Sequence, residues 1–128
     1  MTGLGLSFVP PAFKSSDIDY AYNVTDEIAF SMCHQLGKKE GLLLGASTGA
    51  IISAGLAYAM QQGVKRKKIV LINPDRADRY LDTIYNPDWL AHSQISIYNN
   101  RQLDTHIKQL DPVFESYIDG EGVIDAIS

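Results

Sequence analysis

Glu40-Gly-Leu-Leu-Leu-Gly-Ala-Ser-Thr-Gly-Ala50 joins a short apolar run to the start of a helix. Its three leucines form a short apolar run, and the sequence becomes strongly helical from Thr48 to about Gln62. Between these two elements, residues 45–49 carry almost no side-chain bulk. A strand that ends in small residues at the start of a helix is how an α/β protein forms a ligand pocket. We therefore expect the backbone of this turn and the hydroxyl of Ser47 to be accessible to a ligand.

A second apolar run, Ile69-Val-Leu-Ile72, follows the helix and lacks the alternation of a half-exposed strand. Such a run is typical of a parallel strand that is covered on both faces. A strand, a helix and a strand within about 30 residues form a right-handed crossover unit, whose two strands point the same way. The turns at residues 45–48 and at Asn73–Arg76 should then lie at one edge of the sheet. The sequence predicts that Ser47 and Pro74–Asp75 border a common pocket there.

The segments around this unit predict further elements. Residues 1–16 are rich in Gly, Pro and Ser and are typical of a loop, and residues 18–24 favour a short strand. A helix is expected from its N-cap Thr25 to its last turn at Lys38-Lys39, with Gly41 as the stop. Its core face carries Ile28, Met32 and Leu36, and a second amphipathic helix carries Leu103, Ile107 and Leu110. The sequence therefore predicts an α/β fold, with a partial parallel sheet and flanking helices.

Composition limits the function classes. The 128 residues are 45% hydrophobic and 20% charged, which suffices for one modest core. The formal net charge of -4 argues against nucleic acid as a partner, and the local basic run Lys65-Arg-Lys-Lys68 is expected to be a solvated turn. Cys33 is the only cysteine, so no intrachain disulfide can form. Neither a leader nor an apolar run of membrane-spanning length is recognised. We expect a cytoplasmic protein.

Metal binding is not expected. Cys33 and His34 are sequence neighbours and project in different directions from a helix, and His92 and His106 have no ligand partners at useful spacing.

Three interpretations of the glycine-containing turn stay open, in addition to a family resemblance that is described in the next paragraphs. The turn partly resembles a dinucleotide-binding crossover, although Ile51 stands where the third glycine belongs. The run Gly45-Ala-Ser-Thr-Gly49 also matches the Gly-x-Ser-x-Gly pattern of hydrolases, in which Ser47 would be the nucleophile and His92 or His106 its base. Tight packing without a ligand is the third interpretation.

Three motifs in this order resemble the cysteine synthase family, the β-family (fold type II) of pyridoxal-phosphate enzymes, which includes O-acetylserine sulfhydrylase and cystathionine β-synthase. They are Gly3-Leu-Gly5 with Phe8-Val-Pro10, Glu40-Gly-Leu-Leu-Leu-Gly-Ala-Ser-Thr-Gly49 and Pro74-Asp-Arg-Ala-Asp-Arg-Tyr-Leu81. The resemblance runs from about Gly3 to Trp89 and is to the C-terminal part of these enzymes. The sequence Arg79-Tyr-Leu-Asp-Thr-Ile-Tyr85 is similar to the siderophore-type synthases that make a diaminopropionate precursor from O-phosphoserine and glutamate.

The resemblance implies a role for individual residues. Ser47 would hydrogen-bond the pyridine nitrogen of pyridoxal 5'-phosphate, Pro74 would line the same side of the ring, and Gly3 and Gly5 would face the substrate. Ala77 and Asp78 are mild departures, since the family usually has Gly and Glu at these positions. The covalent lysine, the asparagine-bearing substrate loop and the phosphate loop all belong upstream of Gly3 in the family. The chain is therefore expected to contribute no catalytic residue and to be inactive alone.

The resulting expectation has two parts. Residues 1–92 are interpreted as the C-terminal portion of a synthase that performs β-elimination and replacement on an activated L-serine, with an amine or thiol nucleophile. Residues 93–128 are an extension that would serve as a docking arm, a lid or a linker. The expected partners are the missing N-terminal part or a second polypeptide, a small amino-acid substrate and further copies of the chain, with no nucleic acid or membrane. The alternative function is a non-catalytic binding or interaction piece.

Overall fold

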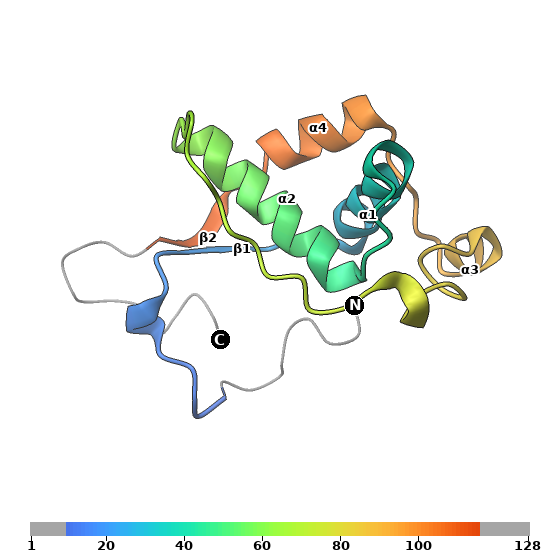
Figure 1. The fold of residues 1–128 in the computed structure, drawn as a ribbon, viewed down its shortest axis with the longest axis horizontal. Coiled ribbons are helices and arrows are strands. Elements are labelled where there is room, and N and C mark those ends of the chain that lie inside the picture. The colour runs from blue at the N-terminus through green and yellow to red at the C-terminus, as the bar shows by residue number, and fades with distance from the viewer. Residues whose placement is uncertain (1–9, 116–128) are drawn as a thin grey trace.

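The computed structural model describes residues 10–115, which form a mixed α and β structure of packed helices beside a small sheet (Figure 1). Its elements in chain order are the 3-10 turn η1 (Ser15–Asp17), strand β1 (Tyr20–Tyr22), helices α1 (Asp26–Glu40) and α2 (Ala46–Gln61), the 3-10 turn η2 (Ala77–Arg79), helices α3 (Pro87–His92) and α4 (Asn100–Lys108), and strand β2 (Pro112–Glu115). No helix in this part of the chain combines the length and the apolar character needed to cross a membrane.

Helix α1 begins and ends where the sequence predicts. The hydroxyl of Thr25 accepts a hydrogen bond from the backbone N–H of Ile28 (3.4 Å), and Gly41 ends the helix at a φ of 68°. This left-handed conformation favours glycine, because a Cβ there would be strained. Ile28 and Met32 are buried, so the predicted core face is confirmed.

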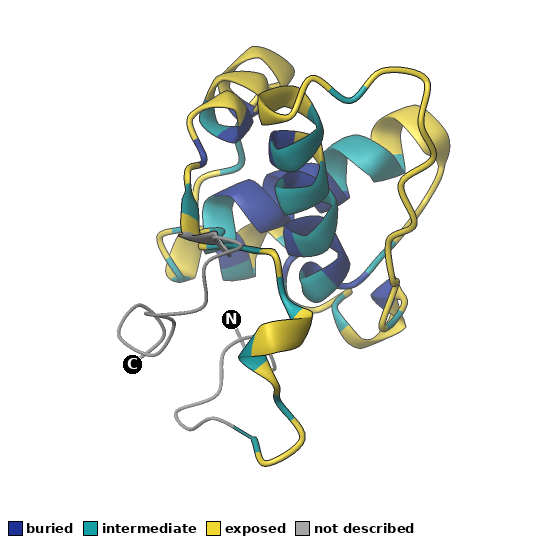
Figure 2. Ribbon diagram, turned by 90° about the vertical axis from the view of Figure 1, so that its left-hand side faces the viewer, coloured by how far each residue is buried: buried dark blue, intermediate teal, exposed yellow. Residues whose placement is uncertain are grey.

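Helices α1 and α2 form the centre of the molecule, and the buried residues gather between them and against α4 (Figure 2). Their close approach depends on a glycine. A Cβ at Gly49 of α2 would lie 2.1 Å from the carbonyl oxygen of Ala29 and 2.7 Å from Sγ of Cys33, both in α1. Gly49 therefore allows the backbones of the two helices to approach each other.

Helix α4 completes this helical group. It begins with a capping box, in which the side chain of Asn99 accepts from the N–H of Gln102 and the side chain of Gln102 accepts from the N–H of Asn99, both at 3.0 Å. Leu103 and Ile107 are buried against α1 and α2. Residues 100–110 thus share a core with the preceding helices, while the predicted boundary after residue 92 stays a prediction.

The expected parallel sheet is not present among the described residues. The sheet that forms is antiparallel and two-stranded, between β1 and β2, where the register pairs Ala21 with Phe114. Residues 42–44 contribute only an isolated antiparallel bridge between Leu44 and Arg76, and residues 69–72 form no strand. The physical reason is that a strand of the buried parallel type needs neighbouring strands and cover on both faces. Here the side chain of Val70 is 90% exposed and that of Ile72 is 75% exposed.

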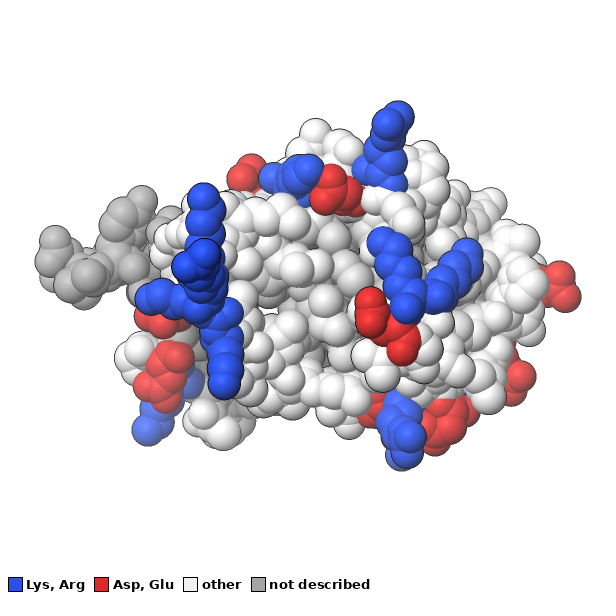
Figure 3. All heavy atoms as spheres, turned by 45° about the horizontal axis from the view of Figure 1, so that its top comes forward, with Lys and Arg blue, Asp and Glu red and all other residues white. Residues whose placement is uncertain are grey.

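The extended segment 64–76 instead lies along α2 (Figure 1). A Cβ at Gly55 would lie 2.9 Å from Cδ2 of Leu71, so Leu71 rests on the helix at that glycine. The basic run at residues 65–68 is exposed, which confirms the predicted solvated turn, and Figure 3 shows a group of Lys and Arg side chains at one end of the molecule.

Candidate functional site

A pocket of about 680 Å³ lies at the N-terminal end of α2. Ser47 lines it from α2, Pro74 and Asp75 from the extended segment, and Trp89 from α3. The predicted convergence of Ser47 with Pro74–Asp75 is therefore confirmed. The two turns meet because the chain after Asn73 folds back along residues 43–45, and not because two parallel strands end at one edge.

Local hydrogen bonds fix which hydroxyl of the turn is available in the pocket. Gly45 is the N-cap of α2, and its carbonyl oxygen accepts from the N–H of Thr48 (3.0 Å) and of Gly49 (3.3 Å). Thr48 is buried, and its hydroxyl donates to Oδ1 of Asn73 at 2.5 Å. Ser47 is half-buried and lines the pocket. Of these two neighbouring hydroxyls, the one on Ser47 is thus placed for a ligand.

The glycines of the turn serve the packing of the chain itself. Gly45 and Gly49 are both buried, and a Cβ at Gly45 would lie 1.8 Å from Oδ1 of Asp75. The expectation that the whole turn is open to a ligand is therefore wrong, because Asp75 covers one glycine and helix α1 covers the other. Ala46 and Ser47 remain as the turn residues that line the pocket.

Side chains hold the backbone that leads into the turn. The hydroxyl of Tyr85 donates to the carbonyl oxygen of Leu44 (2.7 Å) and accepts from its N–H (3.1 Å), while the thiol of Cys33 donates to the carbonyl oxygen of Gly45 (3.3 Å). Burial raises the pKa of Tyr85 to about 12 and the pKa of Cys33 to about 11. Both groups therefore keep their protons at neutral pH, and both remain donors.

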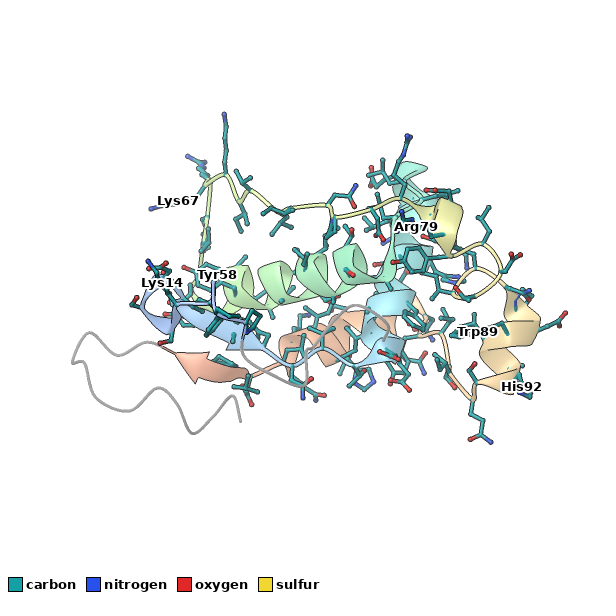
Figure 4. The ribbon with its side chains drawn as sticks, turned by 90° about the horizontal axis from the view of Figure 1, so that it is seen from below. Lys14, Tyr58, Lys67, Arg79, Trp89 and His92 are labelled. Atoms are coloured by element: carbon teal, nitrogen blue, oxygen red, sulfur yellow. The ribbon has the colours of Figure 1, made fainter. Side chains whose placement is uncertain are left out.

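Helix α3 supplies a wall of the pocket that the sequence reasoning missed. Asn86 caps α3 by accepting from the N–H of Asp88 (2.9 Å), and the helix places Trp89 against Phe30, with 6.3 Å between the ring centroids. Figure 4 shows Trp89 on the inner side of α3 and His92 at its outer end. The sequence does contain a signal for the start of α3, namely Asn86-Pro87, an N-cap residue followed by proline at the first helical position.

The residues of the hydrolase interpretation do not come together. His92 is exposed, and His106 of α4 stacks on Tyr98 with 4.3 Å between ring centroids. Neither histidine is among the described residues that line the pocket of Ser47. Within residues 10–115, no three His, Cys, Asp or Glu side chains are grouped so that they could hold a metal ion.

Two predicted site residues, Gly3 and Gly5, lie outside the described residues. Their predicted contact with the substrate stays a prediction.

Comparisons with known proteins find relatives of this chain. The cysteine synthase of Helicobacter pylori is 43% identical over 79 residues, which are 62% of this chain and 26% of that protein. The N-(2-amino-2-carboxyethyl)-L-glutamate synthase of Ralstonia nicotianae is 36% identical over 91 residues, which are 71% of this chain and 27% of that protein. This chain belongs to the cysteine synthase family. A further relative in this family is the O-acetylserine dependent cystathionine beta-synthase of Bacillus subtilis, with 40% identity over 79 residues, which are 62% of this chain and 25% of that protein.

The chain spans about a quarter of the length of these cysteine synthase relatives. No protein-family model matches the chain.

Proposed function

We propose that this chain forms the ring-nitrogen side of a pyridoxal 5'-phosphate site in a synthase of the cysteine synthase type. The observation that carries the proposal is that Ser47 and Pro74 line one pocket of about 680 Å³. A pocket of a few hundred cubic ångströms suits a small cofactor. The reaction class is β-elimination and replacement on an activated L-serine, O-acetyl- or O-phosphoserine, with a thiol or an amine as the nucleophile. The names of the relatives support this class, since they include a cysteine synthase and a glutamate-conjugating synthase.

The donor set of the pocket fits a pyridine ring. Ser47 offers a neutral hydroxyl at the N-terminal end of α2, and Pro74 and Trp89 offer apolar surface for a planar ring. Pyridoxal phosphate supplies an electron sink to a bound amino acid. The hydroxyl of Ser47 does not hold a proton on the ring nitrogen as a carboxylate would, so Ser47 moderates that sink. A moderated sink favours β-elimination over transamination.

The remaining parts of the active site come from outside the described residues. No lysine is among the pocket residues in the described part of the chain. We infer that the covalent lysine and the phosphate loop belong to the remaining three quarters of the synthase, either upstream in the same polypeptide or in a second one. The chain would then bind that part, a small amino-acid substrate and further copies of the complete enzyme.

The exposed apolar segments support this assembly. Leu42 is 49% exposed and Leu43 is 52% exposed, and the side chains of residues 69–72 are exposed as well. We infer that both segments become strands of a fold type II parallel sheet when the rest of the synthase covers them. Without that cover, the chain should self-associate. A monomer with a sharp thermal transition in analytical ultracentrifugation and calorimetry would contradict this inference.

These same exposed segments support the second candidate, a binding piece without catalysis. The two candidates differ in the pocket, because an interaction piece needs no affinity for a pyridine ring. As the site of action we propose the cytoplasm, whose reducing conditions suit the buried free thiol of Cys33.

Trp89 gives a direct test, since it lines the pocket and is the only tryptophan of the sequence. The probe is 4'-deoxypyridoxine 5'-phosphate, which keeps the ring nitrogen and lacks the aldehyde that reacts with surface lysines. We expect saturable quenching of the tryptophan fluorescence. Ser47→Ala should weaken binding by about tenfold, the usual size of one lost hydrogen bond.

The matched control is Ser96→Ala, which removes an exposed hydroxyl outside the pocket and should leave the affinity unchanged. Absence of quenching, or equal affinities for all three proteins, would refute the assignment of Ser47 to the ring. Equal affinities would leave the interaction piece as the better explanation of the exposed segments.

A further inference from the structure

The carboxylate of Asp75 lies directly on Gly45. A Cβ at Gly45 would be 1.8 Å from Oδ1 and 2.8 Å from Cγ of Asp75, and 2.8 Å from Cε2 of Tyr80. The backbone N–H of Gly45 also donates to the carbonyl oxygen of Asp75 at 3.2 Å. Gly45 is therefore held between the backbone and the side chain of the same residue.

Tyr80 orients this carboxylate. Its hydroxyl donates to Oδ2 of Asp75 at 2.6 Å, a charge-assisted hydrogen bond between side chains five residues apart. The hydrogen bond to Asp75 is also the main reason why the pKa of Tyr80 is raised, so the phenol keeps its proton and remains the donor.

The other oxygen of Asp75 lies against the turn. Oδ1 is buried, and no hydrogen-bond donor contacts it in the described part of the chain. It faces Gly45 and is closed to solvent, so a ligand in the pocket would not reach it. This arrangement favours a role in holding the turn over a role in direct ligand contact.

We propose that Asp75 and Tyr80 are positioning residues that fix the turn at Gly45 and thereby the hydroxyl of Ser47 in the pocket. Gly45 is the N-cap of α2, and Ser47 is the second residue of that helix. A displacement of Gly45 therefore moves Ser47 relative to Pro74, because Pro74 belongs to the extended segment 64–76 and not to α2. The part of this inference that concerns the ligand rests on the proposed function of Ser47.

The test compares two tyrosines. Tyr80→Phe removes the hydroxyl that contacts Asp75. Tyr22→Phe removes a hydroxyl that donates to Oε1 of Gln61, also at 2.6 Å, and Tyr22 is not among the pocket residues. Amide hydrogen exchange of Gly45, measured by NMR, reports the turn without any ligand. We expect Tyr80→Phe to accelerate this exchange by about tenfold, and Tyr22→Phe to leave it unchanged.

A double-mutant cycle tests the coupling to Ser47. Tyr80→Phe should weaken binding of 4'-deoxypyridoxine 5'-phosphate by about tenfold in the protein with Ser47, and by less than twofold in the Ser47→Ala background. Tyr80 also lines the pocket, so a direct contact between Tyr80 and the probe, like a purely structural role, would give the same loss in both backgrounds. That result would overturn the proposal. Unchanged exchange of Gly45 in Tyr80→Phe would also overturn it. If the unsubstituted protein binds no probe, the proposed function fails, and the exchange measurement still decides whether Tyr80 holds the turn.

Discussion

Replacing Gly49 by alanine should destabilise the protein, although alanine favours a helix. Alanine gains about 1 kcal/mol over glycine within a helix. The new methyl group would lie 2.1 Å from the carbonyl oxygen of Ala29 and 2.7 Å from Sγ of Cys33. The backbone oxygen belongs to a helix and has little freedom to move, so α1 and α2 must separate. Overpacking of this kind costs about 1–3 kcal/mol or more. Because the oxygen cannot move aside, we take a cost of about 3 kcal/mol, which less the helix propensity leaves a net loss of about 2 kcal/mol in the free energy of unfolding.

Gly55 provides the matched control in the same helix. An alanine there gains the same helix propensity, and the three atoms nearest to its Cβ would all belong to the side chain of Leu71, with Cδ2 at 2.9 Å. The side chain of Leu71 is 39% exposed and can move aside. We expect Gly55→Ala to change the free energy of unfolding by between zero and about 1 kcal/mol, in the stabilising direction.

Urea unfolding followed by far-ultraviolet circular dichroism measures both variants against the unsubstituted protein. The decisive quantity is the difference between the two variants, because helix propensity cancels in it. If Gly49→Ala proves as stable as Gly55→Ala, the close contact between α1 and α2 does not require glycine at position 49. That result would refute the reasoning.

Two further predictions concern pH and the C-terminal helix. Burial raises the pKa of Cys33 from 9.0 to about 11, so between these pH values the folded protein keeps a proton that the unfolded chain releases. The free energy of unfolding should therefore fall by up to about 3 kcal/mol as the pH rises from about 9 to 11. Cys33→Ala should flatten this part of a pH series of urea midpoints. Leu103→Ala should lower the free energy of unfolding by about 2–5 kcal/mol, because Leu103 is 1% exposed in the core of α1, α2 and α4. The control Leu81→Ala, at a side chain that is 54% exposed, should lower it by less than about 1 kcal/mol. Equal shifts of the melting temperature in the two variants would show that α4 is not part of this core.

Helices α1, α2 and α4 could be predicted from the sequence because their signals are local. The N-cap Thr25 and the left-handed Gly41 delimit α1, and the apolar spacing of Leu103 and Ile107 marks α4. The pairing of Ser47 with Pro74 in one pocket could also be predicted, from the two turns that follow apolar runs.

Strand β1, at Tyr20–Tyr22, confirms the short strand predicted for residues 18–24, but the other strands could not be predicted in the same way. A parallel strand is stabilised by neighbours, and the apolar run at residues 69–72 has none within the described chain. Strand β2 was missed because its pairing with β1 joins residues at least 90 positions apart, and no local pattern encodes that contact. The covering of Gly45 by Asp75 was missed for a similar reason, since small residues in a turn signal close approach without saying what approaches.

The extended segment has a consequence for assembly, because it continues directly into the pocket. Residues 69–72 lead to Asn73, which accepts from the buried hydroxyl of Thr48, and to Asp75, which lies on Gly45. A polypeptide that paired with residues 69–72 and moved Asn73 or Asp75 would therefore act on residues beside the pocket. Binding at the two places would then be thermodynamically linked, and a ligand that tightened the association with that polypeptide would itself be held more tightly by the same factor.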